Sequence, residues 1–478
     1  MSKLYLGFDA GTQSVKVFVY DENLKSITSQ SLPTILRYPH AGWVEMDLDE
    51  FLDITVRCIK RCVDDIKALG YDPKDVRAVM GDGIICGIAG VNEEGDAITP
   101  YINYLDTRTD DDVRFINDMN LDIWVKETGN PEACTMFPAM FARWFLKNNT
   151  KFQQQGVKFM HNAPYILSHL AGLKGKDAFI DWGAMSGWGL GYNVMKKEWS
   201  KEQLEILMQS MIGCGNYEAG KGVDVAGTCA MFCVSTKGII PELSKKGNNL
   251  IFNSGSLPDT YFYWGTIRTG GLALRWFKDN VCHKANDAVY YNDLNDRAAQ
   301  VPVGSNGVLF LPYLTGGQDI NNKKCGCFLG LTLDDDQSVM WRSVLESIGF
   351  DYMEICDLYR SAGVDLQRLT VAEGGSRSSL WNQIKSDMLD AEVVRYKNAG
   401  GAVVTNCIFA AYAVKDVPEI IPELSKILQI DQSYQPRAEN TKLYRDLLNL
   451  QRKLIDVDMA PAFATLWNMK KILPQKQN

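Results

Sequence analysis

The sequence predicts an α/β protein of two domains. Residues 4–20 and 223–234 share one pattern, in which an apolar strand, a Gly-Thr turn and a second apolar strand follow one another. Helical and strand periodicities alternate after each of these segments, as in α/β domains. A chain of 478 residues, 46% of them hydrophobic, is long and apolar enough for two or three globular domains. We place the boundary near residue 220, which gives domains of residues 1–220 and 221–478.

The spacing of apolar residues predicts the remaining elements. In the first domain we expect strand character over residues 76–91 and helices over residues 50–68, 138–147, 163–170 and 199–212. In the second we expect strands over residues 308–312 and 369–372 and helices over residues 270–280, 337–358, 378–389 and 402–413.

Charge and composition exclude several classes of partner. There are 50 basic and 58 acidic residues, and a net charge of −8 does not favour nucleic acid or an anionic membrane surface. No apolar segment approaches the length of a membrane span, and Asp9 interrupts the region where a signal peptide would be apolar. Twelve cysteines without zinc-site spacing therefore indicate reduced thiols in the cytoplasm. A homodimer is left open.

A turn at residues 9–16 has the composition of a phosphate-binding loop. Asp9 ends a strand, Gly11 permits a sharp turn and Lys16 adds a positive charge. Hydroxyl and amide groups suited to a phosphate lie between them, on Thr12, Gln13 and Ser14. A polar hairpin turn without a ligand explains this composition equally well, and the Gly-Lys-Ser/Thr ending of a P-loop is absent.

Two later turns have related features. Residues 224–230 repeat the strand and Gly-Thr pattern at Gly227 and Thr228, so that two such turns would bind two ends of a polyphosphate. At residues 373–378, Gly375 and Ser376 lie between a strand and a helix, where close backbone approach and helix N-terminal amides favour a planar or anionic ligand. A helix start capped by serine is the simpler explanation of this last turn.

Together, these segments resemble the FGGY family of carbohydrate kinases, and most of all its xylulokinase-like members. The resemblance extends over nearly the whole chain. It rests on six segments in the family's order, each weak alone: residues 9–16, 42–47, 103–109, 225–228, 308–316 with 330–332, and 373–381.

The resemblance implies two actin-like (ribonuclease-H-like) domains with a nucleotide cleft between them. It implies Mg²⁺- and ATP-dependent phosphorylation of a sugar or polyol hydroxyl, with a ketose such as a pentulose as the expected substrate. Asp9 would hold Mg²⁺, and Ile85, Cys86 and Asp106 would lie on the sugar side. The residues implied for ATP are Thr12, Gln13, Ser14, Lys16, Gly227, Thr228, Gly271, Gly375 and Ser376.

The sugar-side segment departs from the family pattern. Xylulokinase-like members carry Gln-Met-His where this chain has Ile84, Ile85 and Cys86, and glycerol-kinase-like members carry Arg-Glu. Loss of the Gln and His removes hydrogen-bond partners that read sugar hydroxyls. The sequence therefore leaves the sugar open.

The family's general base is missing. In the family, an aspartate in a Gly-x-Gly-Asp turn takes the proton of the sugar hydroxyl. Here the chain passes directly from Leu207 to Met208, where a few dozen residues including that turn would be expected. Either this sequence omits residues of the natural polypeptide, or the protein lacks them. Deleting core strands would expose unpaired strand edges. The free-energy cost would exceed the small net stability of a domain, which favours the first explanation.

Two other functions remain as alternatives. A catalytically silent nucleotide- or sugar-binding regulator of the same fold would bind nucleotide without turnover. An actin- or chaperone-like ATPase would share the phosphate loops, but it leaves residues 43–47 and 103–109 unexplained.

Overall fold

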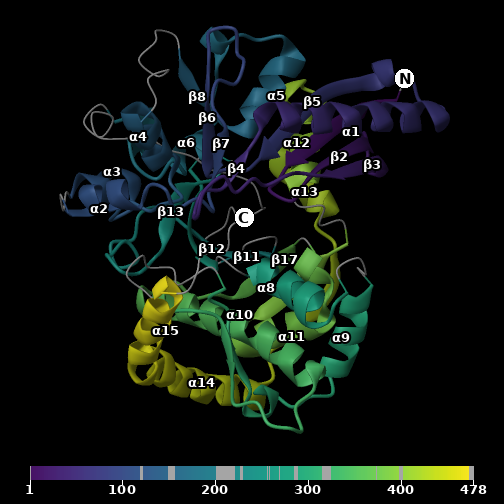
Figure 1. Ribbon diagram of the computed structural model, residues 1–478. Helices are drawn as coiled ribbons and strands as arrows, with labels where there is room; N and C mark the ends of the chain where they lie inside the picture. Colours follow the sequence, from purple (N-terminus) through teal and green to yellow (C-terminus); the bar gives the residue numbers. More distant parts are fainter. Residues whose placement is uncertain are drawn as a thin grey trace. The chain divides into compact units, whose positions relative to one another are not determined.

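The computed structural model describes residues 2–118, 122–148, 157–200, 221–226, 230–255, 257, 259–267, 270–284, 289–314, 324–372, 374–397 and 402–472. The chain forms two compact units, each discontinuous in sequence (Figure 1). Unit 1 contains Met1–Ala219, Ser235–Tyr263 and Lys397–Gln429, and unit 2 contains Gly220–Val234, Trp264–Tyr396 and Ile430–Asn478.

The main sheet of unit 1 has the strand order β3-β2-β1-β5. Its strands are β1 (Leu4–Ala10), β2 (Ser14–Asp21), β3 (Ser26–Pro33) and β5 (Val76–Gly83). β1 pairs antiparallel with β2 and parallel with β5. The turn between β1 and β2 and the carboxyl end of β5 therefore lie at the same edge of the sheet.

Helices cover both faces of this sheet, which explains why β1 is apolar along nearly its whole length. Leu4, Leu6 and Phe8 pack in one core with residues of α1 (Leu48–Ala68) and α5 (Asn162–Ala171). Tyr5, on the opposite face, packs with residues of α12 (Ala402–Ala413) and α13 (Ile420–Ile427). Side chains that alternate with Leu4, Leu6 and Phe8 thus point toward the α12 face.

A second sheet of unit 1 has the order β4-β7-β6-β8. Its strands are β4 (Glu45–Met46), β6 (Gly87–Val91), β7 (Tyr101–Asn103) and β8 (Lys158–Met160). The other strands of unit 1 are short: β9 (Tyr192–Asn193), β10 (Glu198–Trp199) and β13 (Ile251–Ser254). Its remaining α-helices are α2 (Asp110–Asp118), α3 (Ile123–Thr128), α4 (Pro138–Asn148) and α6 (Trp182–Ser186).

Unit 2 repeats the strand arrangement of unit 1. β11 (Lys221–Ala226) pairs antiparallel with β12 (Ala230–Thr236) and parallel with β17 (Arg368–Ala372). The sheet continues through β18 (Glu392–Tyr396) and β19 (Ile430–Tyr434). An antiparallel hairpin whose first strand pairs parallel with a third strand therefore occurs in both halves, and the predicted two-domain α/β fold is confirmed.

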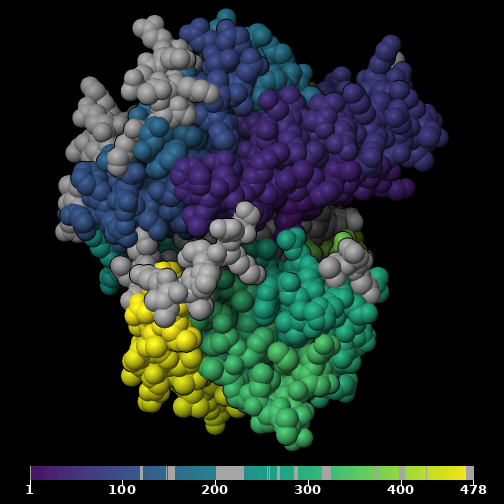
Figure 2. All heavy atoms as spheres, in the orientation of Figure 1, coloured from purple at the N-terminus to yellow at the C-terminus, as the bar shows by residue number. Residues whose placement is uncertain are grey.

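Helices also surround the sheet of unit 2. They are α8 (Gly270–Trp276), α9 (Tyr290–Ala298), α10 (Gln337–Ser361), α11 (Ser379–Leu389), α14 (Ala438–Lys453) and α15 (Ala460–Ile472). β14 (Tyr261–Ile267) lies beside β12 in the same sheet, and β15 (Leu309–Leu311) pairs with β16 (Cys327–Leu329) in a separate two-stranded sheet. Atoms of α14 and α15 (yellow) lie on the surface in Figure 2. On α15, Leu466, Trp467 and Met469 are exposed.

Most predicted elements are present, with three differences. The strand character of residues 76–91 is divided between β5 and β6, because residues 84–86 belong to neither strand. The helix expected over residues 270–280 is α-helical only in α8, up to Trp276, and continues as the π-helical turn Phe277–Val281. Trp199 lies in β10 and not at a helix start, and the rest of the helix predicted to residue 212 lies outside the described residues.

None of the helices in the described ranges has both the length and the apolar character that a bilayer crossing would require.

Candidate functional site

The predicted first phosphate loop is a tight hairpin in unit 1. Asp9 and Lys16 are direct partners on β1 and β2, and Lys16 Nζ lies 3.5 Å from Asp9 Oδ2. The amide of Gly11 donates a hydrogen bond of 3.0 Å to the carbonyl of Ser14. A Cβ at Gly11 would lie only 3.3 Å from that carbonyl oxygen, so glycine fits this turn best. The turn thus holds the predicted metal-binding acid, Asp9, and the predicted phosphate-binding cation, Lys16, close together.

Thr34, just after β3, fixes the backbone of this turn. Its amide donates to the carbonyl of Gln13 at 3.1 Å, and its hydroxyl donates to the carbonyl of Thr12 at 2.6 Å. Because both carbonyls are engaged from the side of β3, the conformation of residues 12–14 is held from outside the loop. The structure therefore brings five predicted residues into one rigid element: Asp9, Thr12, Gln13, Ser14 and Lys16.

Asp82 is an acid of this region that the sequence interpretation missed. It is the parallel partner of Asp9 on β5. Its Oδ1 is buried and has no hydrogen-bond partner within the described part of the chain. Burial, and then the negative charge of Asp9, raise the pKa of Asp82 well above its usual range. The signal in the sequence was an acidic residue at the end of an apolar strand, between Gly81 and Gly83.

Glycines allow the strand ends to approach closely. A Cβ at Gly81 would lie 2.0 Å from the ring of Phe8, and a Cβ at Gly83 would lie 2.6 Å from Asn162 Oδ1. The Asn162 amide donates a hydrogen bond of 2.7 Å to the carbonyl of Ala10. The end of β5 is therefore packed against β1 and α5 with no space for larger side chains.

The predicted sugar-side residue Asp106 is fully buried and bound by protein groups. Its carboxylate accepts hydrogen bonds from the amide of Val44 at 2.6 Å and from the amide and guanidinium of Arg108 at 2.8–2.9 Å. The Arg108 guanidinium also pairs with Glu45 at 2.8 Å and lies 3.7 Å from the centroid of the Trp43 ring. Asp106 thus joins the two motif segments at residues 42–47 and 103–109.

Cys86 lies near the same end of the second sheet. It directly precedes β6, whose first residue, Gly87, pairs with Asn103 of β7. Cys86 is buried, with its sulfur 4.0 Å from the carbonyl of Gly187, whereas Ile85 is only partly buried. Pairing of Gly87 with Asn103 therefore brings the segments that carry Cys86 and Asp106 to one sheet edge.

His161 is a second residue that the sequence interpretation did not assign to a site. Its Nε2 accepts a hydrogen bond of 2.6 Å from the indole of Trp188, and its Nδ1 has no partner among the residues described. Burial lowers the pKa of His161 to about 3, so its ring is neutral. Its position between β8 and α5, far from Cys86 in sequence, gave no local signal.

Three predicted nucleotide residues of unit 2 lie on two described elements. Gly271 is in the first turn of α8, and Gly375 and Ser376 form part of the 3₁₀ helix Gly374–Arg377 between β17 and α11. The carbonyl of Ser376 accepts a hydrogen bond of 2.8 Å from Asn382 of α11. Gly227, Thr228, Leu207 and Met208 lie outside the described residues.

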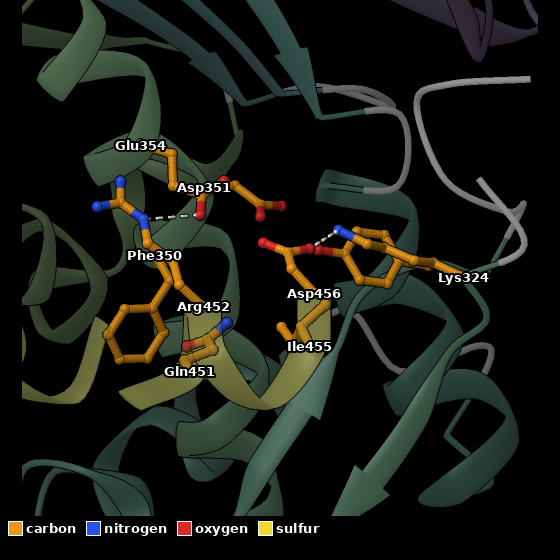
Figure 3. Close-up of a pocket in the computed structure, with 9 residues that line it drawn as sticks. Lys324, Phe350, Asp351, Glu354, Gln451, Arg452, Ile455 and Asp456 are labelled. Carbon is orange, nitrogen blue, oxygen red and sulfur yellow. Dashed lines mark hydrogen bonds and ion pairs between the residues drawn. The ribbon is translucent and has the colours of Figure 1, made fainter. Parts of the chain in front are cut away.

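A pocket of unit 2 contains neither the predicted ATP residues nor the predicted sugar residues (Figure 3). Lys324 pairs with Asp456 at 2.8 Å, and Arg452 pairs with Glu354 at 3.2 Å. Asp351 points into the same space in Figure 3, and burial raises its pKa to about 8. The whole lining is Tyr313, Lys324, Phe350, Asp351, Glu354, Gln451, Arg452, Ile455 and Asp456.

Two family models match successive parts of the chain. The N-terminal domain model of the FGGY family of carbohydrate kinases matches residues 4–212, and its C-terminal domain model matches residues 223–414. Together they cover most of the 478 residues. The chain belongs to the FGGY family of carbohydrate kinases.

Curated relatives align over nearly their whole length. A xylulose kinase of Staphylococcus epidermidis (strain ATCC 12228 / FDA PCI 1200) is 24% identical over 490 residues, which cover 93% of this chain and 95% of the relative. A gluconokinase of Bacillus subtilis (strain 168) is 23% identical over 510 residues, which cover 95% of this chain and 96% of the relative.

Solved structures share the fold. A ligand-bound xylulose kinase from Lactobacillus acidophilus has a TM-score of 0.82 at 18% identity, over 97% of this chain and 100% of that chain. A gluconate kinase from the same species has a TM-score of 0.80 at 19% identity, over 98% of this chain and 100% of that chain. At these identities the likeness concerns the fold alone.

Proposed function

We propose that this protein transfers the γ-phosphoryl group of ATP to a hydroxyl of a sugar, with a ketose such as a pentulose as the first candidate. The observation that carries the proposal is the hairpin that holds Asp9 against Lys16 in a chain of the FGGY family. Phosphoryl transfer needs little covalent chemistry from a protein. It needs aligned reactants and neutralised phosphate charge.

The first hairpin supplies a positive charge and hydrogen-bond donors for the phosphates of the nucleotide. We assign Lys16, with the amides and hydroxyls of Thr12, Gln13 and Ser14, to the ATP phosphates, because backbone donors at a tight turn form anion-binding concavities. In unit 2 we assign Gly271, Gly375 and Ser376 to the nucleotide, together with Gly227 and Thr228.

The side chains beside the hairpin fit a magnesium ion. Asp9 is partly exposed, and the buried Oδ1 of its strand partner Asp82 lacks a hydrogen bond within the described ranges. Mg²⁺ prefers carboxylate oxygens, and it usually takes one or two of them together with waters and phosphates. We therefore assign Asp9 to Mg²⁺, which when bound would neutralise charge on the transferred phosphoryl group.

The sugar is proposed to lie near the edge formed by Ile85, Cys86 and the Asp106 segment. Because Asp106 is saturated by Val44 and Arg108, its proposed role is to hold Arg108 and the backbone around it in place. Apolar Ile85 and buried Cys86 offer few hydrogen-bond donors or acceptors to a sugar. Other groups must therefore form the hydrogen bonds to the hydroxyls of the substrate. Relatives named xylulose kinase and gluconokinase make a pentulose and gluconate the first compounds to test.

The general base is proposed to belong to a segment between Leu207 and Met208. The alignment with the Staphylococcus epidermidis xylulose kinase runs over 490 positions and covers 93% of a 478-residue chain. The relative therefore has residues that this chain lacks, as expected if a segment is missing. The relatives described above are named as kinases, and none of them is named as a regulator. The silent-regulator alternative therefore has no support from them.

A coupled assay of ADP release tests the proposed function. The purified protein would be screened with ATP, Mg²⁺ and a panel of pentuloses, hexuloses, polyols and gluconate. We expect sugar-dependent ADP release with at least one ketose. Measured ATP binding without ADP release for any acceptor would overturn the proposal and favour the silent regulator.

A further inference from the structure

Thr34 contacts the first hairpin through both its backbone and its side chain. Its amide donates a hydrogen bond of 3.1 Å to the carbonyl of Gln13, and its hydroxyl donates one of 2.6 Å to the carbonyl of Thr12. The same hydroxyl lies 3.4 Å from the carbonyl oxygen of Gly11. Three successive carbonyls of the hairpin therefore point toward one residue.

The direction of these carbonyls also sets the direction of three amides. A trans peptide unit is planar, and its C=O and N–H bonds point in opposite directions. The carbonyl of each residue from 11 to 13 belongs to the same peptide unit as the amide of the residue that follows it. The amides of residues 12–14 therefore lie on the side of the hairpin that faces away from Thr34. A phosphate on that side would meet successive backbone donors, as in other anion-binding turns.

The residue before Thr34 cannot supply these contacts. Pro33 is the partner of Ser14 in the ladder between β2 and β3, and proline has no N–H to donate. The amide of Thr34 is the next backbone donor along the chain, and the hydroxyl adds a second donor at the same place. Thr34 is partly buried, so both donors are partly shielded from water.

We propose that Thr34 is a positioning residue for the ATP phosphates, which acts by fixing the peptide groups of residues 11–14. Thr34 does not need to contact the nucleotide, because its two donors are directed at the hairpin. A loop that is already held in its binding conformation loses less conformational freedom when the nucleotide binds, which favours affinity. The proposal rests on the proposed function, which assigns this hairpin to the phosphates.

Thr34→Val tests the role of the hydroxyl, since it removes this donor and keeps the β-branched shape and the backbone amide. ATP affinity would be measured by calorimetric titration, and KM would be measured for ATP and for the accepted sugar. We expect the Kd and KM for ATP to rise about fivefold, the order expected for one neutral hydrogen bond. The KM for the sugar should stay as in wild type.

Thr34→Ser restores the hydroxyl and should recover most of the ATP affinity. Thr34→Ala provides a second variant without the hydroxyl, should Thr34→Val not fold. A residue that only stabilised the fold would give no such difference between the KM for ATP and the KM for the sugar.

Thr28→Val is the matched control on the same strand. Thr28 is also partly buried, and its hydroxyl donates a hydrogen bond of 2.6 Å to Asp65 of α1. This bond has the same length as the one between Thr34 and Thr12, but it does not involve the hairpin. Thr28→Val should lower the thermal midpoint and leave the ATP affinity unchanged.

Three results would overturn the positioning role. They are an unchanged ATP affinity in a folded Thr34 variant without the hydroxyl, an equal loss of ATP affinity in Thr28→Val, and an equal rise in the KM for ATP and for the sugar. ATP binding without ADP release would contradict phosphoryl transfer alone, because the titrations would still decide the role of Thr34. Absence of ATP binding by wild type would contradict both.

Discussion

Asp9 and Asp82 are paired residues on neighbouring parallel strands of one sheet, and Lys16 Nζ lies 3.5 Å from the carboxylate of Asp9. The two acids are 73 positions apart in sequence but share a sheet edge, because β1 and β5 end at the same level. Burial, and then the negative charge of Asp9, raise the pKa of Asp82 beside the loop that we assign to the ATP phosphates.

Replacing Asp9 tests its assignment to the metal. We expect Asp9→Ala to abolish phosphoryl transfer while the circular dichroism spectrum and thermal midpoint change little, because Asp9 is partly exposed and its ion pair with Lys16 is long. Asp53→Ala, which alters an exposed acid of α1, should retain full activity. Near-wild-type activity of Asp9→Ala would contradict the assignment.

Asp106→Asn should affect stability as well as sugar binding. The change leaves the buried Arg108 guanidinium without its main partner, and breaking one side of a buried pair costs about 3 kcal/mol. The affinity for sugar should also fall, because Arg108 and the backbone around it lose the carboxylate that holds them in place, while the affinity for ATP holds.

Chemical denaturation and ligand titration would measure the two effects of Asp106→Asn. Asp111→Asn, at an exposed position of α2, is the control and should change neither. Equal losses of sugar and ATP affinity would argue against a sugar-side position.

Asp351 should make unfolding stability depend on pH. Its folded-state pKa of about 8 lies above its ordinary value, so between pH 4 and pH 8 the native state retains a proton that the unfolded state releases. Native stability contributed by this group therefore falls as pH rises through that window, by at most about 1.4 kcal/mol per pH unit.

Asp351→Asn removes this dependence. We expect the difference in thermal midpoint, variant minus wild type, to grow from pH 5 to pH 8. Asp365→Asn, at an exposed position in the loop after α10, should show no such trend. A difference that stays constant with pH would show that Asp351 is ionised throughout.

The missing base predicts a heavier natural protein. If residues are absent between Leu207 and Met208, the intact mass of the natural polypeptide should exceed 53.6 kDa by several kDa. Peptide sequencing should then find a Gly-x-Gly-Asp turn directly before Met208. A natural mass equal to 53.6 kDa would mean that the protein lacks this base.

The fold was largely predictable because strong local patterns carry it. β1, α1, α10 and α12 lie where apolar periodicity predicts them, since each buries one or both faces in a core. β3 was not predicted because its sequence, SITSQSLP, is mostly polar and only half-buried. Compact unit 1 also includes Lys397–Gln429, because α12 packs on β1, a long-range contact without local signal.

The parts of the site that a local sequence motif defines were predictable. The parts that depend on contacts between distant segments were not. The spacing of Asp9, Gly11 and Lys16 predicted a tight turn with groups of both signs, and the structure has one. Asp82 and His161 gained their unpaired polar atoms only through burial by distant elements. The saturation of Asp106 by Val44 and Arg108 likewise depends on contacts between two segments.

The central claim, transfer of a phosphoryl group from ATP to a sugar, is tested most directly by mass spectrometry of the acceptor. The natural protein would be incubated with ATP, Mg²⁺ and each ketose or gluconate, with Asp9→Ala as the blank. We predict a sugar monophosphate that forms with wild type in proportion to ADP and is absent with Asp9→Ala. ADP production without any phosphorylated acceptor, or no reaction while ATP is bound, would contradict the account.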